Sequence, residues 1–138
     1  MKKITGRWTG EYSINYGTED EPEMAYFHFK SKISENDDGI KGNFIDLTLK
    51  TSDSSIHGFV DEDFISFIRT SDQSPELLEF LHLDNTDRPF EFEFSGNYSE
   101  EENAYQGIWE IVVDEKQEGI QESYLTETRT GAWYMRKE

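Results

Sequence analysis

The stretch Phe90-Glu91-Phe92-Glu93-Phe94-Ser95-Gly96-Asn97-Tyr98 alternates aromatic or small residues with polar ones. Successive side chains of a β-strand point to opposite faces, so this alternation predicts a strand with one buried and one solvated face. After the acidic turn 99–103, the segment 105–113 repeats the pattern with a Tyr, a Trp, an Ile and a Val on one face. The two stretches together predict an antiparallel hairpin.

The same alternation extends through most of the chain. It predicts further strands over residues 4–16, 25–33, 40–49, 54–60 and 63–70, and a closing strand marked by Gly131, Trp133 and Met135. Within 40–49 the apolar face changes after Phe44, which predicts a β-bulge near that residue. No long helix is expected, but Ser74 as N-cap and Pro75 at the first helical position predict a short helix near residues 75–82.

A short repeat, glycine two residues before an aromatic ring, recurs in the predicted strands. Its copies are Gly6-Arg7-Trp8, Gly10-Glu11-Tyr12, Gly42-Asn43-Phe44, Gly96-Asn97-Tyr98, Gly107-Ile108-Trp109 and Gly131-Ala132-Trp133. Small and bulky side chains that share a narrow interior are typical of coiled strands in a small barrel. The predicted fold is therefore all-β, an antiparallel up-and-down β-barrel of about eight strands (8–10) in a single domain, 1–138. A β-sandwich is the alternative, although local hairpins argue against its long crossings.

In an up-and-down barrel, successive connections lie at alternate ends. One end receives the short acidic turns near residues 36–38, 61–62 and 99–103. The other end receives the longer connections at 17–23, 50–53, 71–89 and after Asp114. Long loops carry most binding residues, so we expect the open mouth at this second end.

Composition excludes several classes of protein and partner. The chain has 30 acidic against 13 basic residues, a formal charge of −17, which repels nucleic acid and anionic membrane surfaces. Charged residues on the predicted outer faces also argue against a membrane barrel. There is no cysteine and no apolar stretch typical of a signal peptide, so we expect a cytoplasmic protein.

Seven residues are predicted to bind a ligand in the open half of the barrel. They are Tyr12, Tyr16, Phe27, Asp46, Ser66, Phe92 and Trp109. Asp46 lies on the inner face if the strand has no bulge and faces water if it has one. A buried carboxylate needs a donor, and Arg69 is a candidate partner across the mouth. Burial statistics for charged residues favour the alternative, a solvated surface arginine.

No catalytic or metal site is predicted. The histidines are His28, His57 and His82, and their spacing matches no metal motif. The carboxylate pairs lie at predicted turns, where they favour solubility and discourage association of sheet edges. No nucleophile elbow is recognisable, so an enzyme ranks below a binding protein, and no cofactor is expected.

Several of these motifs resemble the avidin and streptavidin family and the wider calycin group, which includes the lipocalins. The motifs are Ile4-Thr5-Gly6-Arg7-Trp8, Gly42-Asn43-Phe44, Phe94-Ser95-Gly96-Asn97-Tyr98 and Gly107-Ile108-Trp109-Glu110-Ile111. The resemblance implies an eight-stranded barrel, a tetramer and biotin held at the open end. The family's polar biotin contacts do not match, because their positions fall on Gly10, Phe44, Asp46, Phe90 and Phe92 in this chain.

The sequence therefore predicts a non-catalytic barrel that binds one small apolar or aromatic ligand at the long-loop end. The alternative is an interaction or inhibitor barrel that uses its acidic loops against a basic partner and holds no internal ligand. The resemblance also raises the expectation of a homo-oligomer. Neither hypothesis identifies the ligand, and the pattern does not decide whether the interior holds a cavity or a packed core.

Overall fold

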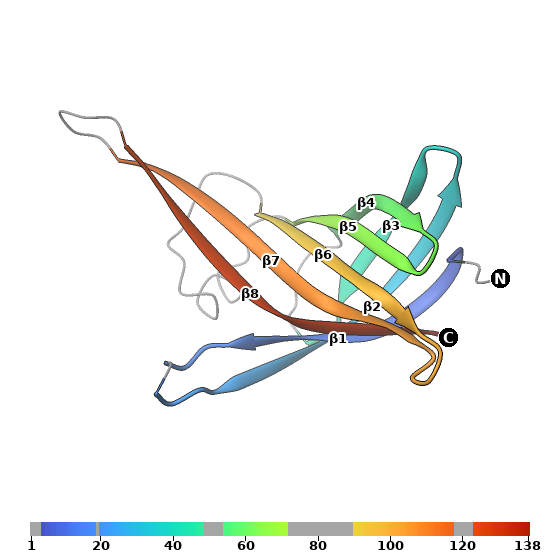
Figure 1. Cartoon of the computed structure of the whole chain (residues 1–138), viewed down its shortest axis with the longest axis horizontal. Coiled ribbons are helices and arrows are strands. Elements are labelled where there is room, and N and C mark those ends of the chain that lie inside the picture. The colour runs from blue at the N-terminus through green and yellow to red at the C-terminus, as the bar shows by residue number, and fades with distance from the viewer. Residues whose placement is uncertain (1–3, 19, 49–53, 72–89, 118–122) are drawn as a thin grey trace.

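A computed structural model of the chain describes residues 4–18, 20–48, 54–71, 90–117 and 123–138. These residues form eight β-strands and no helix (Figure 1). The strands are β1 (Gly6–Asn15), β2 (Met24–Asn36), β3 (Gly39–Asp46), β4 (Ser54–Asp61), β5 (Phe64–Ser71), β6 (Phe90–Ser99), β7 (Ala104–Gln117) and β8 (Ser123–Lys137). The predicted helix near 75–82 lies outside the described residues.

Every strand pairs antiparallel with its neighbour in sequence, and β8 returns to pair with β1, so the sheet closes into a barrel. The predicted all-β up-and-down barrel is confirmed, with eight strands in the described part of the chain. The closed ladder excludes two stacked sheets, and the architecture is compatible with the calycin-like fold. Among the described residues there is no helix long and apolar enough to cross a membrane.

Strict alternation places one face of each strand inside the barrel. Among the residues whose burial the structure describes, twenty hydrophobic side chains are at most 3% exposed, and most of them join one cluster in the interior. The rings pack directly on one another, with centroid distances of 4.3 Å between Phe29 and Phe44 and 4.9 Å between Phe67 and Phe94. Since a barrel of about eight strands is only wide enough to be filled by side chains or to hold one small ligand, these rings fill its middle.

The glycine repeat is explained by close approach of neighbouring strands. Gly96 on β6 faces Gly107 on β7. A Cβ atom built on Gly107 would lie 2.0 Å from the carbonyl oxygen of Ser95 and 2.5 Å from the Cα atom of Gly96. Contacts this short are not possible, so only glycine lets the two strands coil tightly here.

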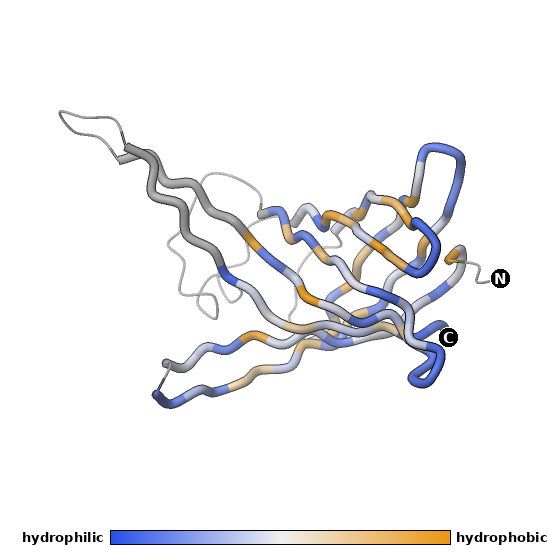
Figure 2. The backbone as a smooth tube through the Cα atoms, viewed as in Figure 1, coloured by the Kyte–Doolittle hydropathy of each residue, from blue (hydrophilic) through white to orange (hydrophobic). Residues whose placement is uncertain are grey.

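The short acidic turns lie together at one end of the barrel, as the lengths of the connections predicted. The short turns at residues 37–38, 62–63 and 100–103 share one end with the start of β1 and the end of β8, and their hydrophilic residues stand out in Figure 2. The expectation of a long loop after Asp114 was wrong, because β7 continues to Gln117 and β8 already begins at Ser123. These strands form a long hairpin, because Val112 to Gln117 pair with residues of β8 at every position.

The predicted bulge near Phe44 is absent. Pairing between β2 and β3 keeps one register from Asn36–Gly39 to Phe29–Asp46, with no extra residue in either strand. The change of apolar face arose because Ile45 and Leu47 are apolar residues on the outer side; Leu47 is exposed. Alternation therefore continues through Phe44 to Asp46, and the carboxylate is directed into the barrel.

Candidate functional site

Five of the seven predicted ligand-binding residues are buried in the barrel. Tyr12, Phe27, Asp46, Phe92 and Trp109 are each at most 7% exposed. The Tyr12 ring stacks on Phe27 with centroids 5.1 Å apart, and Phe92 packs edge-on against Trp109 at 5.5 Å. β1, β2, β3, β6 and β7 each contribute one of these side chains, so the barrel brings together residues that are far apart in the sequence.

The other two predicted residues do not join them. Tyr16 follows the end of β1 and is 37% exposed, and its amide hydrogen-bonds to Glu23 across the connection to β2. Ser66 lies on the outer face of β5, opposite Ser95 of β6, so its predicted inward position was wrong. The inward set of β5 is Ile65, Phe67 and Arg69.

A polar cluster occupies the open half of this apolar interior. The Tyr12 hydroxyl donates a hydrogen bond to Oδ2 of Asp46, and Oδ1 of Asp46 accepts one from the Thr48 amide at 3.3 Å. Arg69 Nη1 donates to the Tyr12 hydroxyl oxygen at 3.4 Å, and Arg69 Nε donates to Ser54 Oγ at 3.3 Å. Arg69 Nη2 lies 3.7 Å from Oδ2 of Asp46, which completes a buried ion pair.

The guanidinium of Arg69 also lies among aromatic rings. Its central carbon is 4.1 Å from the Phe44 ring centroid, 5.4 Å from Phe92 and 5.8 Å from Tyr12. A cation over ring faces gains about 2 kcal/mol or more when it is desolvated. The rings and the Asp46 carboxylate together stabilise a charge that is fully removed from water.

Burial raises the pKa of the Tyr12 hydroxyl above its ordinary value of 10.0. The positive charge of Arg69 acts in the opposite direction, and the Asp46 carboxylate, as a charge and as a hydrogen-bond acceptor, raises the pKa further. The hydroxyl therefore stays protonated at neutral pH and donates to Asp46. It also accepts a hydrogen bond from Arg69, so the Tyr12 hydroxyl connects the Asp46 carboxylate to the Arg69 guanidinium.

One donor of the cluster is left over. Arg69 Nη2 is buried, and among the described residues it has no hydrogen-bond acceptor. An unsatisfied buried donor costs about 1–3 kcal/mol, more when it is charged. Nη2 is therefore a charged donor whose hydrogen-bonding capacity no described residue uses.

The ladder between β1 and β8 ends close to this cluster. The last pair is Tyr12 with Trp133, and beyond it the carbonyl of Ser13 accepts a hydrogen bond from Nε1 of Trp109 at 2.8 Å. A Cβ on Gly131 would lie 2.4 Å from that Nε1 atom and 2.3 Å from the Ser13 oxygen. Because Gly131 has no side chain, the Trp109 indole can reach the Ser13 carbonyl, which lies beyond the last backbone pair of β1 and β8.

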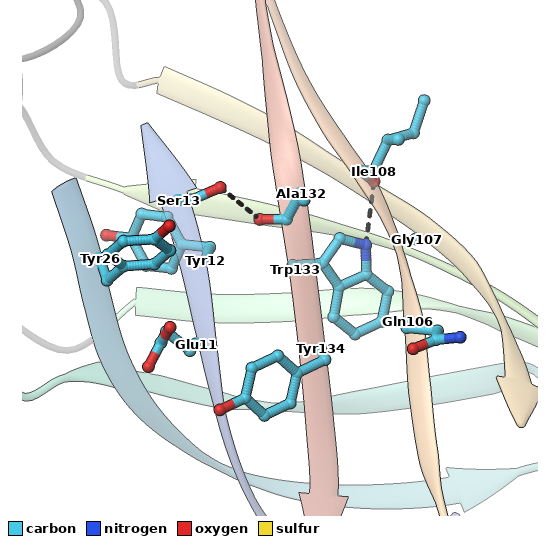
Figure 3. Close-up of a pocket in the computed structure, with 10 residues that line it drawn as sticks. All are labelled: Glu11, Tyr12, Ser13, Tyr26, Gln106, Gly107, Ile108, Ala132, Trp133 and Tyr134. Carbon is cyan, nitrogen blue, oxygen red and sulfur yellow. Dashed lines mark hydrogen bonds between the residues drawn. The ribbon is translucent and has the colours of Figure 1, made fainter. Parts of the chain in front are cut away.

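Concave surfaces also occur on the outside of the barrel. The larger, of about 570 Å³, lies over β2, β1, β8 and β7 and is lined mainly by outward-facing residues such as Glu11, Tyr26 and Tyr134 (Figure 3). A smaller one, of about 260 Å³, lies over β1, β2 and β3 beside Arg7, Lys30 and Lys32. Among the residues that the structure places, no three His, Cys, Asp or Glu side chains form a group that could hold a metal ion.

Sequence reasoning named Arg69 as a candidate partner of Asp46 but favoured a surface arginine, and the buried ion pair corrects that preference. It also missed other members of the cluster. Ser54 was not selected, although it shares the parity of Ile56 on β4. Phe44 was identified only as an inner-face residue, yet its ring lies nearest to the guanidinium. The alternation of inner and outer residues along β3 and β4 could have placed these side chains inside the barrel, provided that β3 was taken to have no bulge.

No family model matches the sequence, and no curated protein or solved structure matches it either.

Proposed function

We propose that this barrel binds one small, largely apolar molecule in its open half and holds a hydrogen-bond acceptor of that molecule against Arg69. The observation that carries the proposal is the buried Nη2 atom, which has no acceptor among the described residues. A carboxylate or carbonyl oxygen suits this position, because a hydrogen bond from a charged donor such as Nη2 is stronger than one between neutral groups. The inner face of the barrel offers rings for the apolar remainder.

The arrangement of the rings supports a ligand on the mouth side of the cluster. Tyr12 has five aromatic rings within 6.5 Å, so side chains already fill the barrel at its level. Phe92 and Trp109 are buried in the open half, with Ile14 near the mouth-side end of β1 and Ile111 two residues beyond Trp109 along β7. A ligand that lies against these side chains places its acceptor at the guanidinium.

From the resemblance to avidins and streptavidins we take only the barrel architecture. Asp46 and Phe44 occupy the third-strand positions where that family has polar biotin contacts, and here they serve the Arg69 cluster. A ureido group at this site loses several hydrogen bonds, each worth about 1–3 kcal/mol when its partner stays buried. We therefore propose a ligand with an acidic or carbonyl head and not biotin.

The experiment compares three ligands that share an eight-carbon chain and differ in the head: octanoate, 1-octanol and octyltrimethylammonium. We expect calorimetry to show octanoate binding about 10–100-fold more tightly than the ammonium compound, since a hydrogen bond to a charged group contributes about 1.5–3 kcal/mol. The formal charge of −17 favours the opposite order, so this preference has to come from local contacts.

Two sets of variants locate the site. Tyr12→Ala and Trp109→Ala should abolish binding of octanoate and 1-octanol alike, because both substitutions remove walls of the pocket. Arg69→Lys keeps the charge but places no donor at the position of Nη2, so it should weaken octanoate about tenfold and leave 1-octanol unchanged. Absence of binding by all three compounds, or octanoate binding that is unchanged in Arg69→Lys, would refute the proposal.

A further inference from the structure

The concave surface on the outside of the barrel has the chemistry of a cation site. It lies across four neighbouring strands, and the register explains its composition. Glu11 of β1 is directly opposite Tyr134 of β8, and Ser13, two residues further along β1, is opposite Tyr26 of β2. Cross-strand partners and their diagonal neighbours lie within side-chain reach, so two tyrosines flank one carboxylate (Figure 3).

Glu11 is an unusual surface carboxylate. Its side chain is only 20% exposed, although it lies on the outer face of the barrel. Among the described residues its one ion-pair partner is His28, whose Nδ1 lies 3.3 Å from Oε2 and which is charged only when protonated. Among the described residues Glu11 therefore has no permanently charged partner, and a partly buried carboxylate favours a positive one.

The tyrosines on either side are suited to the same partner. Tyr26 is 57% exposed, so its ring is available to a ligand. The Tyr134 ring already has one guanidinium near it, because the central carbon of Arg136 lies 5.0 Å from its centroid. Aromatic faces attract cations, and planar guanidinium groups also stack on them.

An apolar surface continues from this acidic centre. Ile108 of β7 is 56% exposed. Ala132 lies between Ile108 and Ser13, and its side chain is too small to fill the concave surface there. Exposed apolar residues beside a polar pocket are typical of protein contact sites. The surface therefore combines one carboxylate, two rings and an apolar shelf, which is the composition that an arginine beside an aliphatic residue requires.

We propose that this surface binds a basic, extended segment of a partner protein, with an arginine side chain on Glu11 between Tyr26 and Tyr134 and an aliphatic side chain on Ile108. Charge complementarity favours this occupant, since the chain carries −17 and its field attracts basic segments from a distance. The site differs from the proposed interior ligand site, because Glu11, Tyr26 and Tyr134 face outward and Arg69 does not contribute to it; the inward-facing Tyr12 and Trp133 contribute only to its base.

The test is an amide NMR titration of the full chain at low salt with the capped peptide Ac-Ile-Ala-Arg-Ala-Ile-NH2, in which the arginine and both isoleucines lie on one face of an extended segment. We expect saturable shifts at Glu11, Tyr26, Ile108 and Tyr134, and about tenfold weaker binding by Glu11→Gln. The matched control is Glu93→Gln on β6, which makes the same change of charge at an exposed outer position and should bind the peptide as the wild type does.

Two further ligands identify what the surface recognises. A peptide with Glu in place of Arg should not bind, and methylguanidinium alone should bind at least tenfold more weakly than the Arg peptide. Equal loss in Glu11→Gln and Glu93→Gln, shifts confined to the acidic turns, or equal affinity for methylguanidinium would overturn the proposal. Octanoate binding is expected to be the same in Glu11→Gln as in the wild type, so failure here is distinct from failure of the interior site.

Discussion

The two halves of the barrel interior are built by the same alternation but differ in chemistry. In the closed half the indole of Trp8 donates to the carbonyl of Ile4 at 2.7 Å, and Tyr105 packs on it at 5.5 Å. In the open half an aspartate and an arginine face each other without solvent, joined by Tyr12. Buried ion pairs add little net stability compared with apolar packing, so the polar half is not explained by stability alone, and the proposed ligand would give it a role.

The closed half should carry most of the stability. Replacing Trp8 by Ala removes a large, 3%-exposed side chain at the floor of the barrel, which costs about 3–5 kcal/mol of the free energy of unfolding. Urea denaturation at neutral pH measures the loss. Thr9→Ala, on the outer face next to it, should stay within about 0.5 kcal/mol. A loss below about 1 kcal/mol for Trp8→Ala would mean that this half is not the packed core.

The open half should respond to broken charge pairing and not to lost volume alone. Arg69→Met leaves the Asp46 carboxylate buried without its cation, and Asp46→Leu leaves the Arg69 guanidinium buried without its anion. Each single variant should therefore lose about 3–5 kcal/mol of the free energy of unfolding. The double variant should be more stable than the sum of the two predicts, with a coupling of about 0.5–3 kcal/mol. Additive losses in this double-mutant cycle would show that the two groups do not interact.

The strand end beside the cluster offers a way to disturb the mouth without changing a polar group. Gly131→Ala places a methyl group against Nε1 of Trp109 and the Ser13 oxygen, so β1 and β8 have to separate. Overpacking of this kind costs about 1–3 kcal/mol. The measurement is the unfolding free energy together with hydrogen exchange of the Trp109 indole, which should become faster. Ala132→Ser, on the exposed outer face, is the control, and unchanged indole exchange would contradict the assigned hydrogen bond.

Tyr12→Phe removes only the hydroxyl that links Asp46 to Arg69, at a cost of about 1–3 kcal/mol at pH 7. Because burial raises the pKa of Tyr12 above 10.0, its stabilising effect is present below pH 10 and is lost as the pH rises further. Wild type should therefore lose up to about 1.4 kcal/mol per pH unit more than Tyr12→Phe above pH 10. Parallel pH curves would show that this hydroxyl is not buried when folded. Burial also raises the pKa of Tyr105, which both proteins retain.

Most of the fold could be predicted from the sequence because alternation in strands such as Phe90–Ser99 is unambiguous. β5 could not be oriented in this way, since Phe64-Ile65-Ser66-Phe67-Ile68-Arg69 is apolar at every position except Ser66 and Arg69. Placing the arginine outside is the ordinary choice, and a change of one position moves every side chain to the other face.

The candidate site was therefore only partly predictable. Asp46 required the absence of a bulge, which depends on pairing with β2 and not on the local sequence. Tyr16 was expected inside because it continues the alternation of β1, but the strand ends at Asn15, whose side chain accepts hydrogen bonds from the Gly17 and Glu23 amides. The outer surface around Glu11 gave no signal, since a glutamate on a polar face is indistinguishable from a solvated one.

The measurement that tests the central claim most directly is ¹⁵N NMR of the Arg69 side chain during titration with octanoate, with Arg69→Lys used to assign the signal. The proposal predicts that the Arg69 Nη resonances shift and saturate together with calorimetric binding, while the arginines on the outer surface stay unchanged. Octanoate that binds without moving the Arg69 resonances, or that does not bind at all, would contradict it.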